Sequence, residues 1–295
     1  MGVGKVTAAI CAALIGLCWA YGPAAQEKNP EPVIAILGAF ENEITLLADR
    51  LTQQRQREIE GIRFFSGRLN GQNVVTAWTG VGKVNAAMTT TLLVEHFKPK
   101  YIIFTGIAGA VNPELRPGDI VIGQKTAHHD MGTVWPEGLF VKGVKNRLDG
   151  MENPVFFPAD EHLLKFAELA AERVGFESIK TITGERTPKI IKGVVVTGDV
   201  FVASTDKCVE LRKKLQADAV EMEGAAVAQI CYQRRIGHIV IRSISDKADE
   251  GAVLDKQMFY ILAAKNSADF VAEIVGLLGS EADVEPTSEG DPSRE

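Results

Sequence analysis

Three acidic residues follow predicted strands at places where a carboxyl group could take part in catalysis. Glu43 comes shortly after the apolar run 33–38, Glu223 follows the run 219–222, and Asp246 follows the run 239–245. Open α/β sheets bind their ligands at the carboxyl ends of their strands, so acids at three such ends are candidates for proton transfer. Each acid alone is also consistent with a residue that begins a helix, where the helix dipole favours negative charge.

The elements that would position these acids alternate along the chain. The run 33–38 is apolar throughout, which is typical of a strand buried on both faces, and Ile44, Leu47 and Leu51 mark one face of a helix. Polar residues from Thr52 onward leave the end of that helix undefined. Alternating strands and helices predict an α/β fold, a single three-layer α/β/α domain with a mixed, mostly parallel central sheet. The predicted strands are 33–38, 62–66, 74–78, 101–104, 120–123, 193–196, 219–221 and 238–241, and the predicted helices are 41–51, 83–97, 161–173, 205–215, 224–234 and 255–278.

Composition and charge exclude several classes of protein. The chain has 295 residues, 46% of them hydrophobic and 24% charged, which is enough for one large folded domain. The net charge is −6, and −5 of it lies in the tail after Ser280, so the rest of the chain is nearly neutral. Because no Lys/Arg stripe is present, nucleic acid is not the expected partner.

The N-terminal segment has the pattern of a targeting signal. An uncharged apolar run, 6–21, precedes the small residues Gly22-Pro23-Ala24-Ala25. The run is short for a membrane span, so we predict a cleaved signal peptide (1–24) and export to the periplasm or the exterior, with no stable membrane partner after cleavage. An uncleaved anchor is the alternative. A linker (25–32), the domain (33–279) and a disordered acidic tail (280–295) follow.

Other short motifs carry less chemistry. The sequence Gly80-Val81-Gly82-Lys83 is not a phosphate loop, because Val84 stands where Ser or Thr is required, and a glycine turn that opens a helix is the better interpretation. His128 and His129 would point to opposite faces of a strand, which favours a structural or interface role over zinc binding. Cys208 and Cys231 lie in helix-like segments and are predicted to be buried thiols.

Six segments, taken in order, resemble the signatures of the methylthioadenosine/S-adenosylhomocysteine nucleosidases of the purine nucleoside phosphorylase superfamily. The resemblance spans about residues 33–278, and it implies a nucleoside phosphorylase-like fold and, through the family's activity, a part in methionine salvage. The segments are 36–43 (ILGAFENE), 80–87 (GVGKVNAA), 104–109 (FTGIAG), 198–202 (GDVFV), 220–223 (VEME) and 242–249 (RSISDKAD).

The resemblance implies a catalytic role for two of the three acids. Asp246 would protonate or hydrogen-bond N7 of adenine, so that the base leaves neutral, and Ser245 would orient it. Glu43 would hold and activate the attacking water, with Arg242 and Glu221 as supports. The reaction passes through an oxocarbenium-like state, which nearby carboxylates stabilise.

The remaining implied roles are in binding. Glu223 would accept hydrogen bonds from the ribose hydroxyls and Met222 would pack beneath the sugar. Phe201 would stack on adenine, the backbone of Val202 would read the edge of the base, and Phe40 would line the pocket for the 5′-alkylthio group. No metal or organic cofactor is implied. The implied partners are a small adenine nucleoside and a second copy of the chain.

In the implied homodimer, the neighbouring subunit covers the 5′ end of the pocket. Apolar residues between Ala110 and Phe140, including Val111, Pro113 and Trp135, are candidates for that lid.

Two alternatives to a nucleosidase stay open. Ile107 replaces the serine usual in the family, and the lost hydroxyl leaves a ribose or water contact in question. A phosphate-dependent phosphorylase needs cations around the phosphate, whereas this chain has Thr105 and the acids Glu41 and Glu43 at those positions. A non-catalytic exported relative that binds or stores nucleosides would not need Glu43, Glu223 and Asp246 together.

Overall fold

The apolar run that opens the domain forms the strand β1 (Ile34–Gly38), all five residues of which are buried. In the computed structural model, which describes residues 33–181 and 184–280, β1 lies inside a large sheet with a parallel neighbour on each side. A strand in this position has both faces covered by other layers, which explains why it has no polar side.

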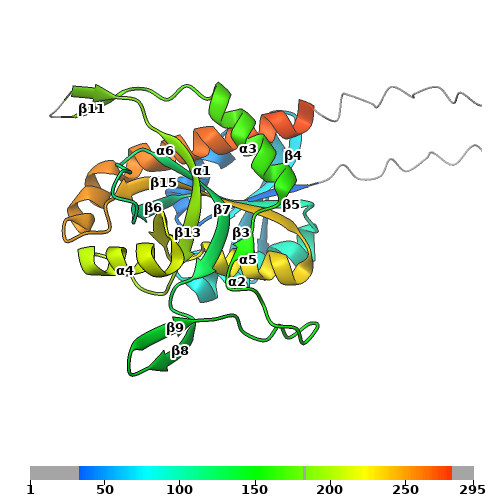
Figure 1. Cartoon of the computed structure of the whole chain (residues 1–295). Coiled ribbons are helices and arrows are strands. Elements are labelled where there is room, and N and C mark those ends of the chain that lie inside the picture. The colour runs from blue at the N-terminus through cyan, green and yellow to red at the C-terminus, as the bar shows by residue number, and fades with distance from the viewer. Residues whose placement is uncertain (1–32, 182–183, 281–295) are drawn as a thin grey trace, which may run out of the picture. The chain divides into compact units, whose positions relative to one another are not determined.

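The central sheet is mixed and mostly parallel, with antiparallel pairs at both edges and between β14 and β6 in its middle (Figure 1). Its strands are β1, β2 (Thr52–Ile59), β3 (Ile62–Leu69), β4 (Gln72–Trp78), β5 (Tyr101–Phe104), β6 (Ile107–Ala110), β7 (Ile120–His128), β10 (Phe157–Pro158), β13 (Ile190–Thr197), β14 (Ala219–Glu221) and β15 (Gly237–Asp246). Their order is β10-β7-β13-β14-β6-β15-β5-β1-β4-β3-β2. Two hairpins stand apart from the sheet, β8 (Gly132–Trp135) with β9 (Gly138–Val141), and β11 (Ile179–Thr181) with β12 (Gly184–Arg186).

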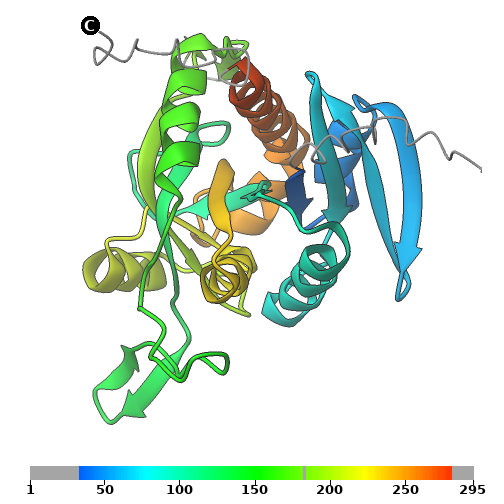
Figure 2. The same ribbon diagram turned by 90° about the vertical axis from the view of Figure 1, so that its right-hand side faces the viewer.

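Helices cover both faces of the sheet and complete a three-layer architecture (Figures 1 and 2). On one face α1 (Glu41–Ala48) and α3 (Glu161–Arg173) pack against α6 (Ala252–Ser280), and their apolar side chains form one core with the sheet. On the other face α2 (Lys83–Phe97) packs against α5 (Gly224–Arg234), beside α4 (Thr205–Leu215). The predicted α/β class and three layers are therefore confirmed.

The structure corrects the first predicted helix. The prediction was 41–51, whereas α1 ends at Ala48 and residues 52–59 form β2, which pairs with β3 as an antiparallel hairpin. Seven of the eight β2 residues are exposed, so the strand shows no apolar alternation by which the sequence could reveal it. The helices α2, α3, α4 and α5 have the predicted bounds.

Several predictions concern other parts of the chain. Cys208 and Cys231 are buried free thiols, as predicted. The predicted signal peptide, linker and acidic tail lie outside the described residues, apart from Ser280 at the end of α6. Within the described residues, none of the helices combines the length and the apolar character that crossing a membrane requires.

Candidate active site

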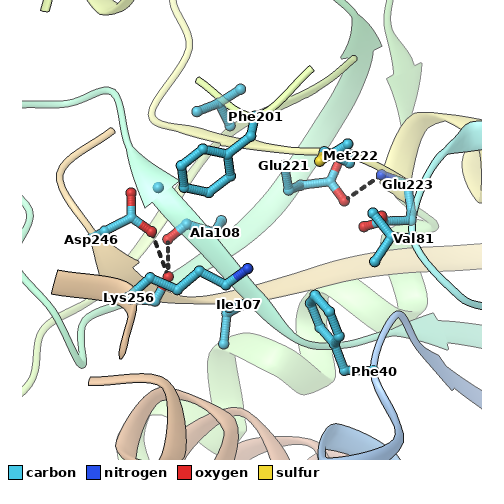
Figure 3. A pocket seen from close by; sticks show the side chains of 13 residues that line it. Phe40, Val81, Ile107, Ala108, Phe201, Glu221, Met222, Glu223, Asp246 and Lys256 are labelled. Carbon is cyan, nitrogen blue, oxygen red and sulfur yellow. Dashed lines mark hydrogen bonds between the residues drawn. The ribbon is translucent and has the colours of Figure 1, made fainter. Parts of the chain in front are cut away.

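A cavity of about 260 Å³ lies where β6, β14 and β15 meet four loops and the start of α6 (Figure 3). Eight of the residues predicted for the site line it, and Glu43, Arg242 and Val202 lie outside its wall. The eight are Phe40, Ile107, Phe201, Glu221, Met222, Glu223, Ser245 and Asp246, and the wall is completed by Val81, Ala108, Gly109, Val220 and Lys256.

Asp246 ends β15 at a break in the register between β15 and β6, which turns its carboxyl group toward the cavity. Ser245 Oγ donates to Oδ2 over 2.7 Å, and the backbone N–H of Ala248 donates to Oδ1 over 2.9 Å. Burial raises the pKa of Asp246 from 3.8, and these hydrogen bonds oppose the rise without cancelling it. A carboxyl group with a raised pKa in a cavity wall is suited to donate a proton.

Glu43 lies in the first turn of α1 and folds back over the helix N-terminus. Its Oε2 accepts from the backbone N–H groups of Ala39 and Phe40, at 2.8 and 2.9 Å, and its Oε1 accepts from that of Ile107 at 3.0 Å. Burial raises the pKa of Glu43, and the positive charge of Arg242 opposes this. Ile107 lines the cavity and Glu43 does not, so the Glu43 carboxylate lies behind the part of the cavity wall that Ile107 forms, which we call the cavity floor.

Arg242 supplies the positive charge behind this floor. The residue is 1% exposed and its guanidinium lies 4.2 Å from the centre of the Phe104 ring. Nη2 is 2.5 Å from Glu221 Oε2, and Nη1 donates to the carbonyl of Thr105 over 2.6 Å. The positive charge of this buried guanidinium offsets part of the cost of burying the neighbouring carboxylates close to one another.

Glu223 immediately precedes α5 and reaches across to another loop. Its Oε1 accepts from the backbone N–H of Gly82 over 2.8 Å, so the glycine turn that opens α2 faces a protein carboxylate. Burial and the neighbouring Glu221 raise the pKa of Glu223 to about 8. Met222, from the same connection, lines the cavity beside it (Figure 3).

Two further contributors to the site, Thr197 and Lys256, lie outside the six segments that carry the family resemblance, whereas a third, Val81, belongs to the segment 80–87. The hydroxyl of Thr197, at the end of β13, donates to Glu221 and accepts from the backbone N–H of Ala225 over 2.7 Å. Lys256 and Val81 line the cavity. Each is an ordinary residue of a strand end, a helix or a turn, and only the packing of distant segments brings it to the site.

The histidine pair is structural. His128 accepts or donates a hydrogen bond of 3.0 Å with Gln229, and both His128 and His129 are buried, which lowers the pKa of each. Asp130 accepts from Lys83 Nζ over 2.6 Å. In the described part of the chain, no cluster of three His, Cys, Asp or Glu residues is arranged to hold a metal ion.

The sequence and the fold match a known class. The family model of the phosphorylase superfamily matches residues 33–276. A protein from Geobacillus sp. (strain WCH70), named 5′-methylthioadenosine/S-adenosylhomocysteine nucleosidase, is 38% identical over 247 residues, 83% of this chain and 98% of its own length. This chain belongs to the 5′-methylthioadenosine/S-adenosylhomocysteine nucleosidase family of that superfamily.

Solved structures agree with this assignment. The nucleosidase of the same name from Neisseria meningitidis, in complex with methylthio-immucillin-A, is 34% identical, covers 83% of this chain and 99% of its own, and has a TM-score of 0.72. A futalosine hydrolase of Helicobacter pylori is 28% identical, covers 83% of this chain and 97% of its own, and has a TM-score of 0.70. Relatives with this fold are therefore named for different substrates, and the preferred substrate has to be argued from the cavity.

Proposed function

We propose that the cavity hydrolyses the N-glycosidic bond of 5′-alkylthio adenine nucleosides and releases adenine. The observation that carries this proposal is Asp246, a buried carboxyl group of raised pKa that faces the cavity and is oriented by Ser245. Protonating or hydrogen-bonding N7 makes adenine a neutral leaving group, and that step requires an acid which keeps its proton near neutral pH.

The other groups of the site fit the rest of this reaction. As the base departs, positive charge develops on the ribose, and the carboxylates around the cavity stabilise it. Glu223 is placed to accept from the ribose hydroxyls, Phe201 to stack on adenine and Phe40 to contact the 5′ group. Glu43 would act from beneath the floor, through a water molecule that reaches its Oε1 beside Ile107.

Water is favoured over phosphate as the nucleophile. The cation nearest to Glu43, Arg242, already binds Glu221 and the carbonyl of Thr105. A phosphate dianion at this end of the cavity would meet Glu43, Glu221 and Glu223, and no arginine of the described residues lines the cavity wall to balance them.

The test is to incubate the purified protein with methylthioadenosine or S-adenosylhomocysteine, with and without phosphate, and to identify both products. We expect adenine and a free sugar in both conditions. A strict requirement for phosphate and a sugar 1-phosphate product would show a phosphorylase, whereas tight binding without product would show the storage protein.

We also propose that the protein acts as a homodimer in which a neighbouring subunit covers the 5′ end of the cavity. The β8–β9 hairpin projects from the rest of the fold (Figures 1 and 2) and exposes Val134, Trp135 and Phe140. Such an apolar group on a surface is typical of an interface. Of the other predicted lid residues, Pro113 is exposed, and Val111, although mostly buried, lines a second surface cavity beside it.

Export remains a proposal that rests on the sequence of residues 1–25. An uncharged apolar run followed by small residues is what signal peptidase recognises. N-terminal sequencing of the protein recovered from fractionated cells tests it. A mature chain that begins at Ala25 outside the cytoplasm is expected, and an intact Met1 in the cytoplasm would contradict it.

A further inference from the structure

Among the described residues that line the active-site cavity, Lys256 is the only one with a positive charge, and no step of the proposed hydrolysis uses it. Its side chain extends from α6 toward the middle of the cavity (Figure 3). The ammonium nitrogen lies 4.9 Å from the centre of the Phe40 ring and 5.4 Å from that of the Phe201 ring. A positive charge therefore stands between the two aromatic residues that are expected to contact the nucleoside.

This charge has no ion-pair partner among the residues that the structure describes. In the described part of the chain the ammonium of Lys256 forms no ion pair, and its direct contacts are the two aromatic rings. Lys256 is half-buried, and removing an ammonium from water is costly when no anion compensates. The rings offset part of that cost through cation–π attraction, but they leave the donors of the ammonium free for an acceptor that enters the cavity.

The position of Lys256 indicates which part of a substrate it would contact. A second cavity, of about 510 Å³, is lined by Val253, Gln257 and Tyr260 and shares Phe201 and Lys256 with the first. Lys256 thus stands at the junction of the two cavities, and its ammonium lies over the ring of Phe40.

With adenine at Asp246 and ribose at Glu223, Phe40 marks the side toward which the 5′ substituent points. The second cavity gives an extended substituent room to pass Lys256.

We propose that Lys256 selects nucleosides whose 5′ substituent carries an anionic group, such as a carboxylate, which the ammonium binds at the junction of the two cavities. This inference rests on the proposed function, because it takes adenine and ribose to be bound as described above. S-adenosylhomocysteine carries a carboxylate, beside an ammonium, on its 5′ substituent, whereas that of methylthioadenosine is a neutral methylthio group. Lys256 therefore favours the former class.

A matched pair of substrates tests the charge alone. 5′-Deoxy-5′-(2-carboxyethylthio)adenosine and its carboxamide have nearly the same size and differ in one negative charge. We expect the wild-type protein to have the higher kcat/KM on the carboxylate. Lys256→Met should lower the ratio of the two kcat/KM values roughly tenfold, the scale of a charge-assisted hydrogen bond. Lys256→Arg, which keeps the charge, should retain most of the preference.

The ratio is the right readout because Lys256 also acts on the catalytic acid. Its positive charge lowers the pKa of Asp246, so Lys256→Met alters the chemical step for every substrate. That effect is common to both substrates and cancels in the ratio. Lys265→Met is the control, since it removes a charge from the same helix at an exposed position where Lys265 pairs with Asp269.

Each outcome decides a different point. An unchanged ratio in Lys256→Met, or an equal change in Lys265→Met, would overturn the inference while leaving the nucleosidase intact. A phosphate requirement that disappears in Lys256→Met would assign the lysine to the nucleophile and overturn it as well. If the wild-type protein releases adenine from neither substrate nor from methylthioadenosine, the proposed function itself fails.

Discussion

The carboxyl groups of Glu43, Glu221 and Glu223 are buried around the guanidinium of Arg242, and that of Asp246 is buried in the wall of the same cavity. Burial is the largest influence on the pKa of Glu43, Glu223 and Asp246, and it raises all three. A site with more acids than cations repels anionic nucleophiles and stabilises the positive charge that develops on an oxocarbenium-like sugar. Burial, together with the neighbouring charge of Glu221, raises the pKa of Glu223 to about 8, which favours its protonated form near neutral pH in the free protein.

Replacing the proposed acid should separate binding from chemistry. In Asp246→Asn the new amide oxygen can still accept from Ala248, and its NH₂ can donate to Ser245, whose hydroxyl can then turn to the carbonyl of Ala108. The fold should persist, but no proton can pass to N7. We expect kcat on methylthioadenosine to fall by roughly 10²–10⁴-fold. Binding of a nucleoside analogue, measured by calorimetry, should change far less.

Near wild-type turnover by Asp246→Asn would show that another group supplies the proton. Ser245→Ala is the matched variant, because it removes the orienting hydroxyl and keeps the carboxyl group. A smaller loss of kcat than in Asp246→Asn is expected from it.

Glu223 should make stability depend on pH. Its pKa rises from 4.5 to about 8 on folding, so between these values the folded protein keeps a proton that the unfolded chain has released. The free energy of unfolding therefore falls as pH rises through this window. Glu223→Gln removes this dependence, so its stability relative to wild type should increase from pH 5 to pH 8, as measured by urea unfolding at each pH.

The wild type and Glu223→Gln have to be compared at each pH, because His238 also makes stability depend on pH. Burial lowers the pKa of His238 to about 4, so its contribution to the free energy of unfolding rises with pH. Its contribution is common to wild type and variant and cancels in the difference. A difference in stability that stays constant across the window would show that Glu223 is ionised in the folded protein at all these pH values.

At the scale of elements, the site residues that could be predicted from the sequence are those at the ends of strands. Glu223 follows β14 and Asp246 ends β15, two strands that pair with β6 in opposite directions. Each acid could therefore be predicted from its place at a strand end, whereas their meeting at one cavity could not. The clear apolar runs and helical spacings likewise predicted most of the secondary structure. The strand β2 could not be predicted from the sequence, because a strand in an exposed edge hairpin needs no apolar face.

Contacts made by distant segments could not be predicted in this way. Lys256 lies in the first turns of α6 as one polar residue among several, and nothing in the spacing indicates that it enters the cavity. The floor position of Glu43 was also not foreseen. It follows from the approach of the backbone of Ile107, which depends on how β6 sits beside α1.

Gly106, which leads into β6, is required by this approach. It has a φ of +143°, and a Cβ there would lie 2.6 Å from both Glu43 Oε1 and Arg242 Nη1. Gly106→Ala should therefore displace Glu43 and Arg242, and lower both kcat and the melting temperature. Gly61→Ala is the control, since Gly61 has a φ of +76° in the β2–β3 turn with nothing near its Cβ. The control should lose roughly 1–3 kcal/mol of stability at most and keep its kcat. Equal activity in both variants would contradict this account of β6.

At the scale of the whole molecule, large exposed apolar side chains occur on several parts of the fold, and two of these surfaces bear on the proposed dimer. Val134, Trp135 and Phe140 are 77%, 60% and 66% exposed on the β8–β9 hairpin. Leu254 and Ile261 are 68% and 78% exposed on α6, which lies on the opposite side of the sheet from that hairpin (Figure 1). The proposed dimer assigns the hairpin to the interface, and the two surfaces can be tested separately.

We expect the wild-type protein to be a dimer at micromolar concentration by light scattering. Trp135→Glu should shift it toward monomer, because burying an unpaired charge in the interface is costly. If the hairpin also covers the 5′ end of the neighbouring cavity, KM should rise more for methylthioadenosine than for adenosine, which lacks the 5′-alkylthio group. Ile261→Glu places the same charge on the other exposed surface and should leave the dimer intact. A monomeric wild-type protein would refute the dimer. Dissociation caused by Ile261→Glu instead of Trp135→Glu would place the interface on α6 and remove the hairpin from the cavity.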